Sequence, residues 1–456
     1  MINIDIKLPE AVLEIFSVIK EYGTEAYIVG GCVRDSIMGR NPHDWDICTP
    51  VLAPELQVLF EEKGYKVVPT GLQHGTVTVV IDGEGYEITQ FRRDGNYTDG
   101  RHPDNVEFTS DLSEDLERRD FTINAMAYNP MTGLIDPFDG MRDIRNRRIV
   151  CVGSARERFK EDALRILRAI RFAAQLDFSI ASDTSFEILM QYKNLENISI
   201  ERINSEFVKI VTTAKLGEEL ARYGNVFWLF IPELKNMFEF PQNNPYHCYD
   251  VWYHTLAAIN NCGSEDLITR LSVIFHDIGK PHCYQDDEEG VRHFKGHGRV
   301  SADMTDSIMR RLRFDNDTRE KVVELIYYHD TTFEVGTKYV KRWLNKIGEK
   351  QFRRLLELRK ADIKAQNPNY MEEQLEKITD IENILENILI GRQCFTIGDL
   401  AINGNDVMRT MRINEGKDVG YWLNEILNRV MDGALKNDRN GLVYWMTGIT
   451  DGWIKF

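Results

Sequence analysis

Residues 28–47 read Ile-Val-Gly-Gly-Cys-Val-Arg-Asp-Ser-Ile-Met-Gly-Arg-Asn-Pro-His-Asp-Trp-Asp-Ile. This pattern predicts an apolar strand, a Gly30-Gly31 turn, a short helix and a second strand that carries Asp44 and Asp46. Because alternate side chains of a strand share one face, both carboxylates would point the same way. Two adjacent carboxylates repel each other, and a cation relieves that repulsion.

The same stretch offers ligands for a metal ion and for phosphate. Mg²⁺ prefers carboxylate oxygens and is commonly completed by water and substrate phosphates. Gly30 and Gly31 lack a Cβ atom, so N–H groups there can approach phosphate oxygens, and Arg34 adds positive charge. The segment therefore predicts Mg²⁺-dependent chemistry on a nucleoside triphosphate, with Asp44 and Asp46 as the catalytic metal ligands. Each motif alone would more often be an ordinary turn or polar loop.

A β-hairpin is predicted next, with strands at 74–81 and 86–92 around a turn at 82–85. Glu87 on the second strand is a candidate third metal ligand, and a solvent-facing Glu on an edge strand is an equal alternative. Residues 92–103 are polar and rich in turn formers, so we expect a mobile loop beside the site.

Residues 118–127 read Arg-Arg-Asp-Phe-Thr-Ile-Asn-Ala-Met-Ala. The order of all these segments resembles nucleotidyltransferases with a catalytic head of the DNA polymerase beta type. It is most similar to the class II tRNA nucleotidyltransferases, or CCA-adding enzymes, and their poly(A) polymerase relatives. The resemblance implies that Arg119, Asp120 and Asn124 bind the incoming nucleotide at its ribose, and that the loop at 92–103 serves addition of the terminal A.

Residues 161–171 have apolar positions at helical spacing, which predicts that Asp162 and Arg165 are neighbours on one side of a helix. Cytosine and adenine present an N–H donor beside a ring-nitrogen acceptor, whereas uracil and guanine present an acceptor oxygen beside an N–H. An Asp that accepts and an Arg that donates therefore fit C and A and oppose U and G. Arg168 is a further candidate for nucleotide binding. Alone, this segment would be a surface helix with an internal salt bridge.

Seven of the ten histidines lie between residues 247 and 329. His276 and Asp277 follow an apolar helix, and His254 and Asp362 lie on the apolar sides of two others. Polar groups aimed at a core need partners, and a shared metal ion satisfies them together.

This set resembles an HD domain, a helical metal-dependent phosphohydrolase module. The resemblance implies a divalent metal of unknown identity held by His254, His276, Asp277 and Asp362. Further candidates are His297 and His329 for a second metal and Lys280 for a phosphate contact. The module would trim damaged RNA ends, such as cyclic phosphates, or only shape the body that holds tRNA.

The composition fits a multidomain protein of 456 residues, 43% of them hydrophobic. Seven cysteines without a CxxC pair, and no signal peptide or long apolar run, predict a reduced cytoplasmic protein without a membrane segment. The net charge of −16 is unusual for an RNA-binding protein, but residues 118–171 hold twelve Lys or Arg and seven Asp or Glu. A basic region therefore borders the proposed site.

The resemblance implies an α+β fold. A nucleotidyltransferase head with a mixed sheet would span 1–145, and an all-α neck for base selection and RNA binding would span 146–220. An HD-type helical domain would span 221–350, with Asp362 just beyond it, and a helical body and tail for tRNA binding would span 351–456.

The activity implied is template-independent addition of CCA to tRNA 3′ ends from CTP and ATP. Its partners would be CTP, ATP and the acceptor stem and 3′ end of tRNA. One alternative is an enzyme of the same fold that adds only the terminal A or a poly(A) tail. Another is an HD phosphohydrolase whose head binds nucleotide or RNA without transfer.

Overall fold

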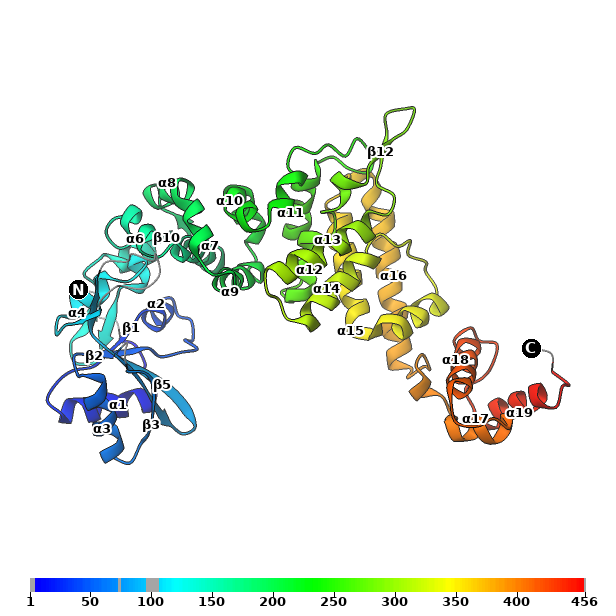
Figure 1. The fold of residues 1–456 in the computed structure, drawn as a ribbon, viewed down its shortest axis with the longest axis horizontal. Helices are drawn as coiled ribbons and strands as arrows, with labels where there is room; N and C mark the ends of the chain where they lie inside the picture. The colour runs from blue at the N-terminus through cyan, green and yellow to red at the C-terminus, as the bar shows by residue number, and fades with distance from the viewer. Residues whose placement is uncertain (1–4, 73–74, 96–105, 455–456) are drawn as a thin grey trace. The chain divides into compact units, whose positions relative to one another are not determined.

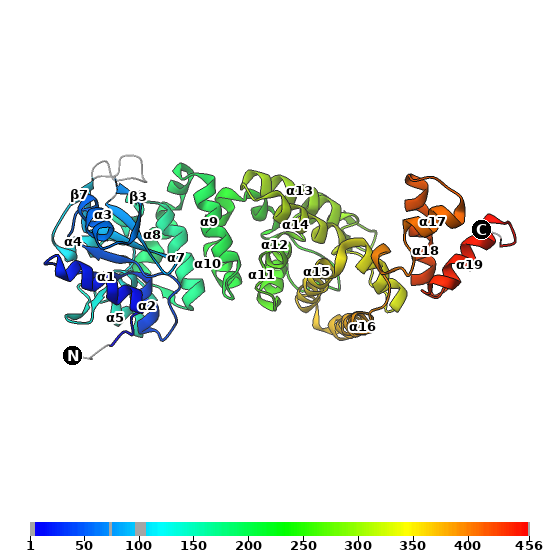
Figure 2. The ribbon, with the colours of Figure 1, turned by 90° about the horizontal axis from the view of Figure 1, so that it is seen from below.

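The computed structural model describes residues 5–72, 75–95 and 106–454 (Figure 1). The chain divides into two compact units, Met1–Pro232 and Glu233–Phe456. The first unit combines a sheet with helices, and the second consists mainly of helices (Figure 2). The predicted α+β class is confirmed. Within the described part of the chain, no helix is long and apolar enough to cross a membrane.

The first unit begins with the elements of the sheet and its helices. They are α1 (Glu10–Glu21), β1 (Tyr27–Val29), α2 (Gly31–Ile37), β2 (Ile47–Thr49), α3 (Ala53–Glu62), β3 (Lys66–Gly71), β4 (Thr76–Ile81), β5 (Glu84–Gln90), β6 (Arg92–Asp94), β7 (Val106–Phe108), α4 (Leu112–Glu117), η2 (Thr122–Asn124), β8 (Ala127–Asn129) and β9 (Gly133–Ile135). It continues with α5 (Gly140–Arg145), β10 (Arg148–Ile149), α6 (Ala155–Glu161), α7 (Leu164–Leu176), β11 (Ser179–Ile180), α8 (Ser182–Gln191), η3 (Tyr192–Asn197), α9 (Ile200–Val211) and α10 (Leu216–Phe230).

The main sheet has seven strands in the order β3-β4-β5-β2-β1-β8-β9. Only the β2–β5 pair is parallel among its described strands. One face packs against α1 and α3 through apolar residues such as Ile15, Leu56 and Ile47. The other face packs Val29 and Cys48 against Leu116 of α4. Because both faces are covered, the short central strands β1 and β2 are buried except for the partly exposed Tyr27.

The predicted hairpin is confirmed as β4 and β5, paired antiparallel. Its turn is shorter than expected, because Asp82 and Gly83 both have positive φ, 51° and 86°, as a two-residue hairpin loop requires. The predicted loop at 92–103 begins instead as a strand, since β6 pairs with β7. Residues 96–103 of that loop, like His74 of the predicted first strand, lie outside the described residues.

Two local predictions were wrong. Asp44 and Asp46 precede β2 rather than lie in it, because pairing with β5 starts only at Ile47; the Asp46 carbonyl still accepts a hydrogen bond from Val29 N at 3.0 Å. The helix predicted over 161–171 breaks, since α6 ends at Glu161 and Asp162 is extended. The Asp162 carboxylate accepts a hydrogen bond from the N–H of Leu164, the first residue of α7, as short polar side chains commonly do.

The second unit is built around a group of helices that surrounds the histidines. Its elements are η4 (Pro232–Met237), α11 (Val251–Asn261), α12 (Leu267–Phe275), η5 (Lys280–His282), β12 (Gln285–Asp286), β13 (Arg292–His293), α13 (His297–Arg311), α14 (Asn316–Tyr328), α15 (Thr337–Lys364), η6 (Pro368–Tyr370), α16 (Met371–Ile390), η7 (Ile397–Asp399), α17 (Gly404–Met411), α18 (Lys417–Met431) and α19 (Arg439–Thr450). The last three helices share a core of their own. The three predicted domain boundaries stay predictions.

Candidate functional site

A cavity of about 630 Å³ in the first unit gathers most of the residues predicted for nucleotide chemistry. The residues predicted from the sequence that line this cavity are Gly30, Gly31, Arg34, Asp44, Asp46, Arg119, Asp120, Asn124, Asp162, Arg165 and Arg168. Glu87 does not line it. Its neighbour Ile88 packs into the core, and Glu87 is exposed on β5. The third carboxylate considered from the sequence is therefore not part of this cavity.

Gly30 allows the backbone to approach the cavity closely. Its φ of 80° is one that other residues rarely adopt. A Cβ atom there would lie 2.9 Å from Arg119 Nη1 and 3.9 Å from Asp46 Oδ2. At Gly31, which begins α2, a Cβ atom would meet only ordinary contacts. The requirement for glycine is thus strict at the first position alone.

The Asp44 and Asp46 carboxylates form the acidic side of the cavity. Both are exposed to it, and no described residue donates a hydrogen bond to either. The pKa of Asp46 is raised, first because the cavity walls displace water and then by the charge of Asp44, while Arg119 opposes the shift. A divalent cation would remove this repulsion, so the donor set fits Mg²⁺.

Positive and polar groups also line the cavity. Arg34 donates to Asn124 Oδ1 at 2.7 Å and to its neighbour Asp35. Arg168 donates to Asp120 Oδ2 at 2.7 Å, and Asn124 donates to Asp120 Oδ1 at 3.2 Å. Burial would raise the pKa of Asp120, but the charge and hydrogen bond of Arg168 hold it below its usual range. Asp120 and Asn124 therefore lie together in the wall of the cavity.

The two residues predicted to select the base line the same cavity, but each has another partner. Asp162 accepts a hydrogen bond from Arg202 at 2.7 Å. Arg165 forms an ion pair with Glu161 and donates to the carbonyl of Arg118 at 3.0 Å. The internal Asp162–Arg165 salt bridge considered from the sequence is absent from the described contacts. Because a carboxylate oxygen accepts more than one hydrogen bond, Asp162 retains capacity for a base edge.

Several lining residues were missed as nucleotide contacts. They include His43, Arg118, Arg171, Phe172, Arg202 and Lys209. The usable signal for Arg171 was its spacing of three from Arg168, which puts both on one side of α7. Arg202 comes from α9, so only the folded chain brings it to Asp162.

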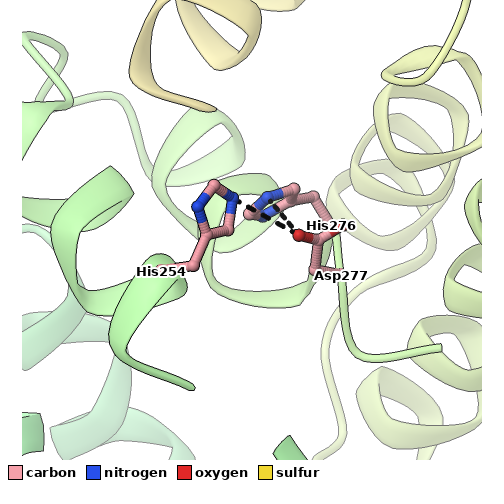
Figure 3. A group of neighbouring side chains, drawn as sticks. All are labelled: His254, His276 and Asp277. Carbon is pink, nitrogen blue, oxygen red and sulfur yellow. Dashed lines mark ion pairs between the residues drawn. The ribbon is translucent and has the colours of Figure 1, made fainter. Parts of the chain in front are cut away.

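The second unit contains a histidine pocket of about 440 Å³. At its base, His254 of α11 meets His276 and Asp277, which follow α12 (Figure 3). The Nε2 atoms of the two histidines lie 3.4 and 3.2 Å from Asp277 Oδ2, and His254 Nε2 lies 3.1 Å from Asp362 Oδ1. All four side chains are buried.

A second group lies on the other side of the same aspartate. His297 Nε2 is 3.3 Å and His329 Nε2 is 3.6 Å from Asp277 Oδ1, and the two ring nitrogens are 3.0 Å apart. Bonds of about 2.1 Å to one metal ion would leave neighbouring ligand atoms roughly 3 to 3.5 Å apart. Both groups therefore have the dimensions of a metal site, with Asp277 as a common ligand.

The orientation of the rings supports this assignment. His254, His276, His297 and His329 each direct Nδ1 toward a backbone carbonyl oxygen, at 3.2, 2.8, 2.8 and 2.6 Å. If Nδ1 donates, each Nε2 carries a lone pair that points at the centre, the usual arrangement of metal-bound histidines. Among the described residues, His276 Nε2 and Asp277 Oδ2 are buried without a hydrogen bond of good geometry. Both atoms are therefore suited to bind a metal ion.

The pocket also contains cations that fit a phosphate. Lys280 Nζ lies 2.7 Å from Asp277 Oδ2 and donates to Gln242 at 2.8 Å, and Arg359 donates to Asp362 at 2.9 Å. Burial would raise the pKa of both aspartates, but Lys280 and His276 lower that of Asp277, and His254 and Arg359 lower that of Asp362, well below its usual range.

His247 and Arg359 are among the residues lining this pocket that the sequence interpretation missed. His247 packs edge-on against His254, with ring centroids 4.9 Å apart, and burial lowers its pKa to about 3. Arg359 lies three residues before Asp362 on α15, a spacing that could have indicated it.

Two family models match the chain. Residues 26–150 match the Poly A polymerase head domain, which covers the strands and loops around Asp44 and Asp46. Residues 297–446 match the model described as tRNA nucleotidyltransferase domain 2 putative.

A CCA-adding enzyme of Lactococcus lactis subsp. lactis is 33% identical over 441 residues, 95% of this chain and 96% of its own length. The chain belongs to the family of CCA-adding enzymes. The CCA-adding enzyme of Lactobacillus johnsonii is 48% identical over 206 residues, so there the match spans 44% of this chain and about half (51%) of that relative. The resemblance inferred from the motif order is confirmed.

A solved structure of this family is also similar in fold. The CCA-adding enzyme of Bacillus stearothermophilus in complex with CTP matches with a TM-score of 0.68 and 27% identity, over 97% of both chains. The mixed sheet followed by helices is therefore a shared architecture, and CTP is a ligand of that relative.

Proposed function

We propose that the protein adds C, C and A in turn to the 3′ end of tRNA, using CTP and ATP and releasing pyrophosphate. The observation that carries the proposal is the cavity that Asp44 and Asp46 line together with several guanidinium groups. Similarity to the Lactococcus lactis CCA-adding enzyme over nearly the whole chain supports it.

In the proposed reaction, the 3′-hydroxyl oxygen of the RNA bonds to the α-phosphorus of the nucleotide while the bond to pyrophosphate breaks. Mg²⁺ held by Asp44 and Asp46 would supply charge neutralisation at the reacting phosphate. Arg34, Arg119 and Arg168 provide donors for the triphosphate. Among the described residues, the buried Nε of Arg119 has no acceptor, which suits a nucleotide contact.

Base choice is proposed for Asp162 and Arg165. Arg202 holds Asp162, and Glu161 holds Arg165, so both groups are oriented before the nucleotide arrives. Such preorganisation strengthens rejection of U and G, because a mismatched base would leave polar groups unpaired. The same pair of residues would also serve an enzyme that uses only ATP. Addition of only the terminal A is therefore the alternative to test.

The test is gel-resolved extension of three tRNA transcripts, ending before CCA, after C and after CC. Each is incubated with CTP, ATP or both, with Asp44→Ala as control. Addition of two C residues and then one A supports full CCA addition. Extension of only the CC-ending transcript supports the A-adding alternative, and no extension contradicts both.

For the histidine pocket we propose a second function, metal-dependent hydrolysis of phosphate esters. Two ligand groups that share Asp277, beside Lys280 and Arg359, are the observation that favours it. Hydrolysis of a nucleoside 2′,3′-cyclic phosphate after loading with Mn²⁺, Ni²⁺ or Zn²⁺ tests it, with Asp277→Asn as control. Equal rates in both proteins would overturn this function.

A cytoplasmic location also remains a prediction.

A further inference from the structure

Phe172 of α7 lies in the wall of the nucleotide cavity, and its side chain is almost fully buried. Three guanidinium groups lie over its ring. Their Cζ atoms are 4.2 Å (Arg171), 5.1 Å (Arg34) and 5.5 Å (Arg168) from the ring centroid. Phe121 packs against the same ring edge-to-face, with centroids 5.7 Å apart. One aromatic ring is thus the common contact of three cations.

Each guanidinium has a carboxylate partner of its own. Arg34 pairs with Asp35 of α2, Arg168 with Asp120, and Arg171 with Glu206 of α9 at 2.7 Å. Arg34 and Arg168 are also linked through the hydrogen bonds of Asn124 and Asp120. Arg171 comes close to that network at the ring of Phe172.

The convergence of three like charges has an electrostatic cost. Burial lowers the pKa of Arg171, the charges of Arg168 and Arg34 lower it further, and Glu206 opposes the shift. The negative face of an aromatic ring attracts cations, most strongly where water is excluded. A ring therefore holds the guanidinium groups together without adding a formal negative charge, which would repel phosphate.

We propose that Phe172 is a positioning residue for the triphosphate. Its ring holds Arg34, Arg168 and Arg171 at one place in the cavity wall, so that their donors serve the same polyphosphate chain. The inference rests on the proposed nucleotidyl transfer and adds a role for a residue that itself makes no polar contact with the nucleotide.

The test compares Phe172→Leu, which removes the ring face, with Phe172→Tyr, which keeps it. In Phe172→Leu, the KM for CTP and ATP and the Kd for inorganic tripolyphosphate should rise about tenfold, as expected for lost cation–π contacts in a dry site. The Kd for cytidine should change less than about threefold, because cytidine carries no phosphate for the guanidinium groups to bind. The kcat should change less than the KM, because contacts that hold the triphosphate equally in the ground state and the transition state leave kcat unchanged. Phe172→Tyr should behave like the wild type.

Three results would overturn the inference. They are unchanged tripolyphosphate binding in Phe172→Leu, equal losses for cytidine and tripolyphosphate, and equal effects of Leu and Tyr. Calorimetric binding of tripolyphosphate needs no tRNA and no turnover. Failure of the wild type to extend tRNA would therefore refute the proposed transfer and still leave the role of Phe172 measurable.

A double-mutant cycle with Arg171→Lys sharpens the test. If the ring acts through Arg171, the double variant Phe172→Leu/Arg171→Lys should lose less tripolyphosphate affinity than the product of the two single losses. Strict multiplication of the losses would show that the two side chains act independently and would contradict the proposal for this pair.

Discussion

The nucleotide cavity and the histidine pocket both gather carboxylates for a divalent cation, but they are built in different ways. Asp44 and Asp46 are exposed, and no described side chain orients them by a hydrogen bond. His276, Asp277 and Asp362 are buried, and the histidine rings are anchored to backbone carbonyls. The first site suits a metal that arrives with its substrate, and the second suits one held by the protein alone.

The two sites also differ in how far nearby positive charges compensate their carboxylates. The pKa of Asp46 is raised by lost hydration and by Asp44, so its negative charge is under-compensated. Burial would raise the pKa of Asp277 too, but nearby cations hold it low. The cavity therefore attracts a cation from solution, whereas in the pocket a metal ion competes with Lys280 for Asp277.

The largest expected effect comes from a substitution that disables the nucleotide cavity and leaves the histidine pocket intact. Asp46→Asn should lower kcat for tRNA extension by about a thousandfold or more, because it removes charge that would bind Mg²⁺ at the reacting phosphate. Metal content of the histidine pocket should not change. Glu87→Gln is the matched control, since Glu87 does not line the cavity; an equal loss in that variant would contradict our description of the site.

The converse change is Asp277→Asn. Because Asp277 is common to both ligand groups, its loss should reduce the bound metal to near zero, while His329→Ala should remove only one of two ions. Elemental analysis of metal-loaded, desalted protein measures this directly. Extension of tRNA should stay within about threefold of wild type, because additive effects are expected for separate sites. One metal ion in the wild type would refute the shared-ligand arrangement.

A smaller effect is expected on base choice. Asp162→Asn replaces one acceptor with a donor, so discrimination against UTP and GTP should fall by about 10- to 100-fold. The ratio of kcat/KM for CTP and UTP on a transcript lacking CCA gives the measurement. Arg202→Lys, which keeps a cation beside Asp162, should retain most of the discrimination; unchanged selectivity in Asp162→Asn would move base choice elsewhere.

The smallest expected effect is on stability, and it concerns a buried carboxylic acid that belongs to neither candidate metal site. Burial raises the pKa of Glu219 in α10 to about 7, above its ordinary value of 4.5, with Arg222 opposing the shift. Because the folded-state pKa is the higher one, stability should fall as pH rises from about 4.5 to 7, by ~3 kcal/mol at most. Glu219→Gln should remove this dependence in urea unfolding at pH 5 and pH 8. An identical pH profile in both proteins would show that Glu219 is not responsible.

Periodicity predicted the elements that depend on local pattern. The β4–β5 hairpin and the helix that carries His254 both occur near their expected positions. It failed where a side chain competes with the backbone, as at Asp162, which interrupts the predicted helix. It also failed where tertiary pairing decides a strand's start, as at Ile47.

For the two candidate sites, the sequence by itself determined which chemical groups are present and in what order, because metal ligands and guanidinium groups are recognisable residue types. Only the tertiary structure decided their partners. Asp162 meets Arg202 and Phe172 meets Arg34 across long stretches of chain, and Asp277 lies between two histidine groups. Such contacts depend on the packing of distant helices, and residue spacing along one helix carries no information about them.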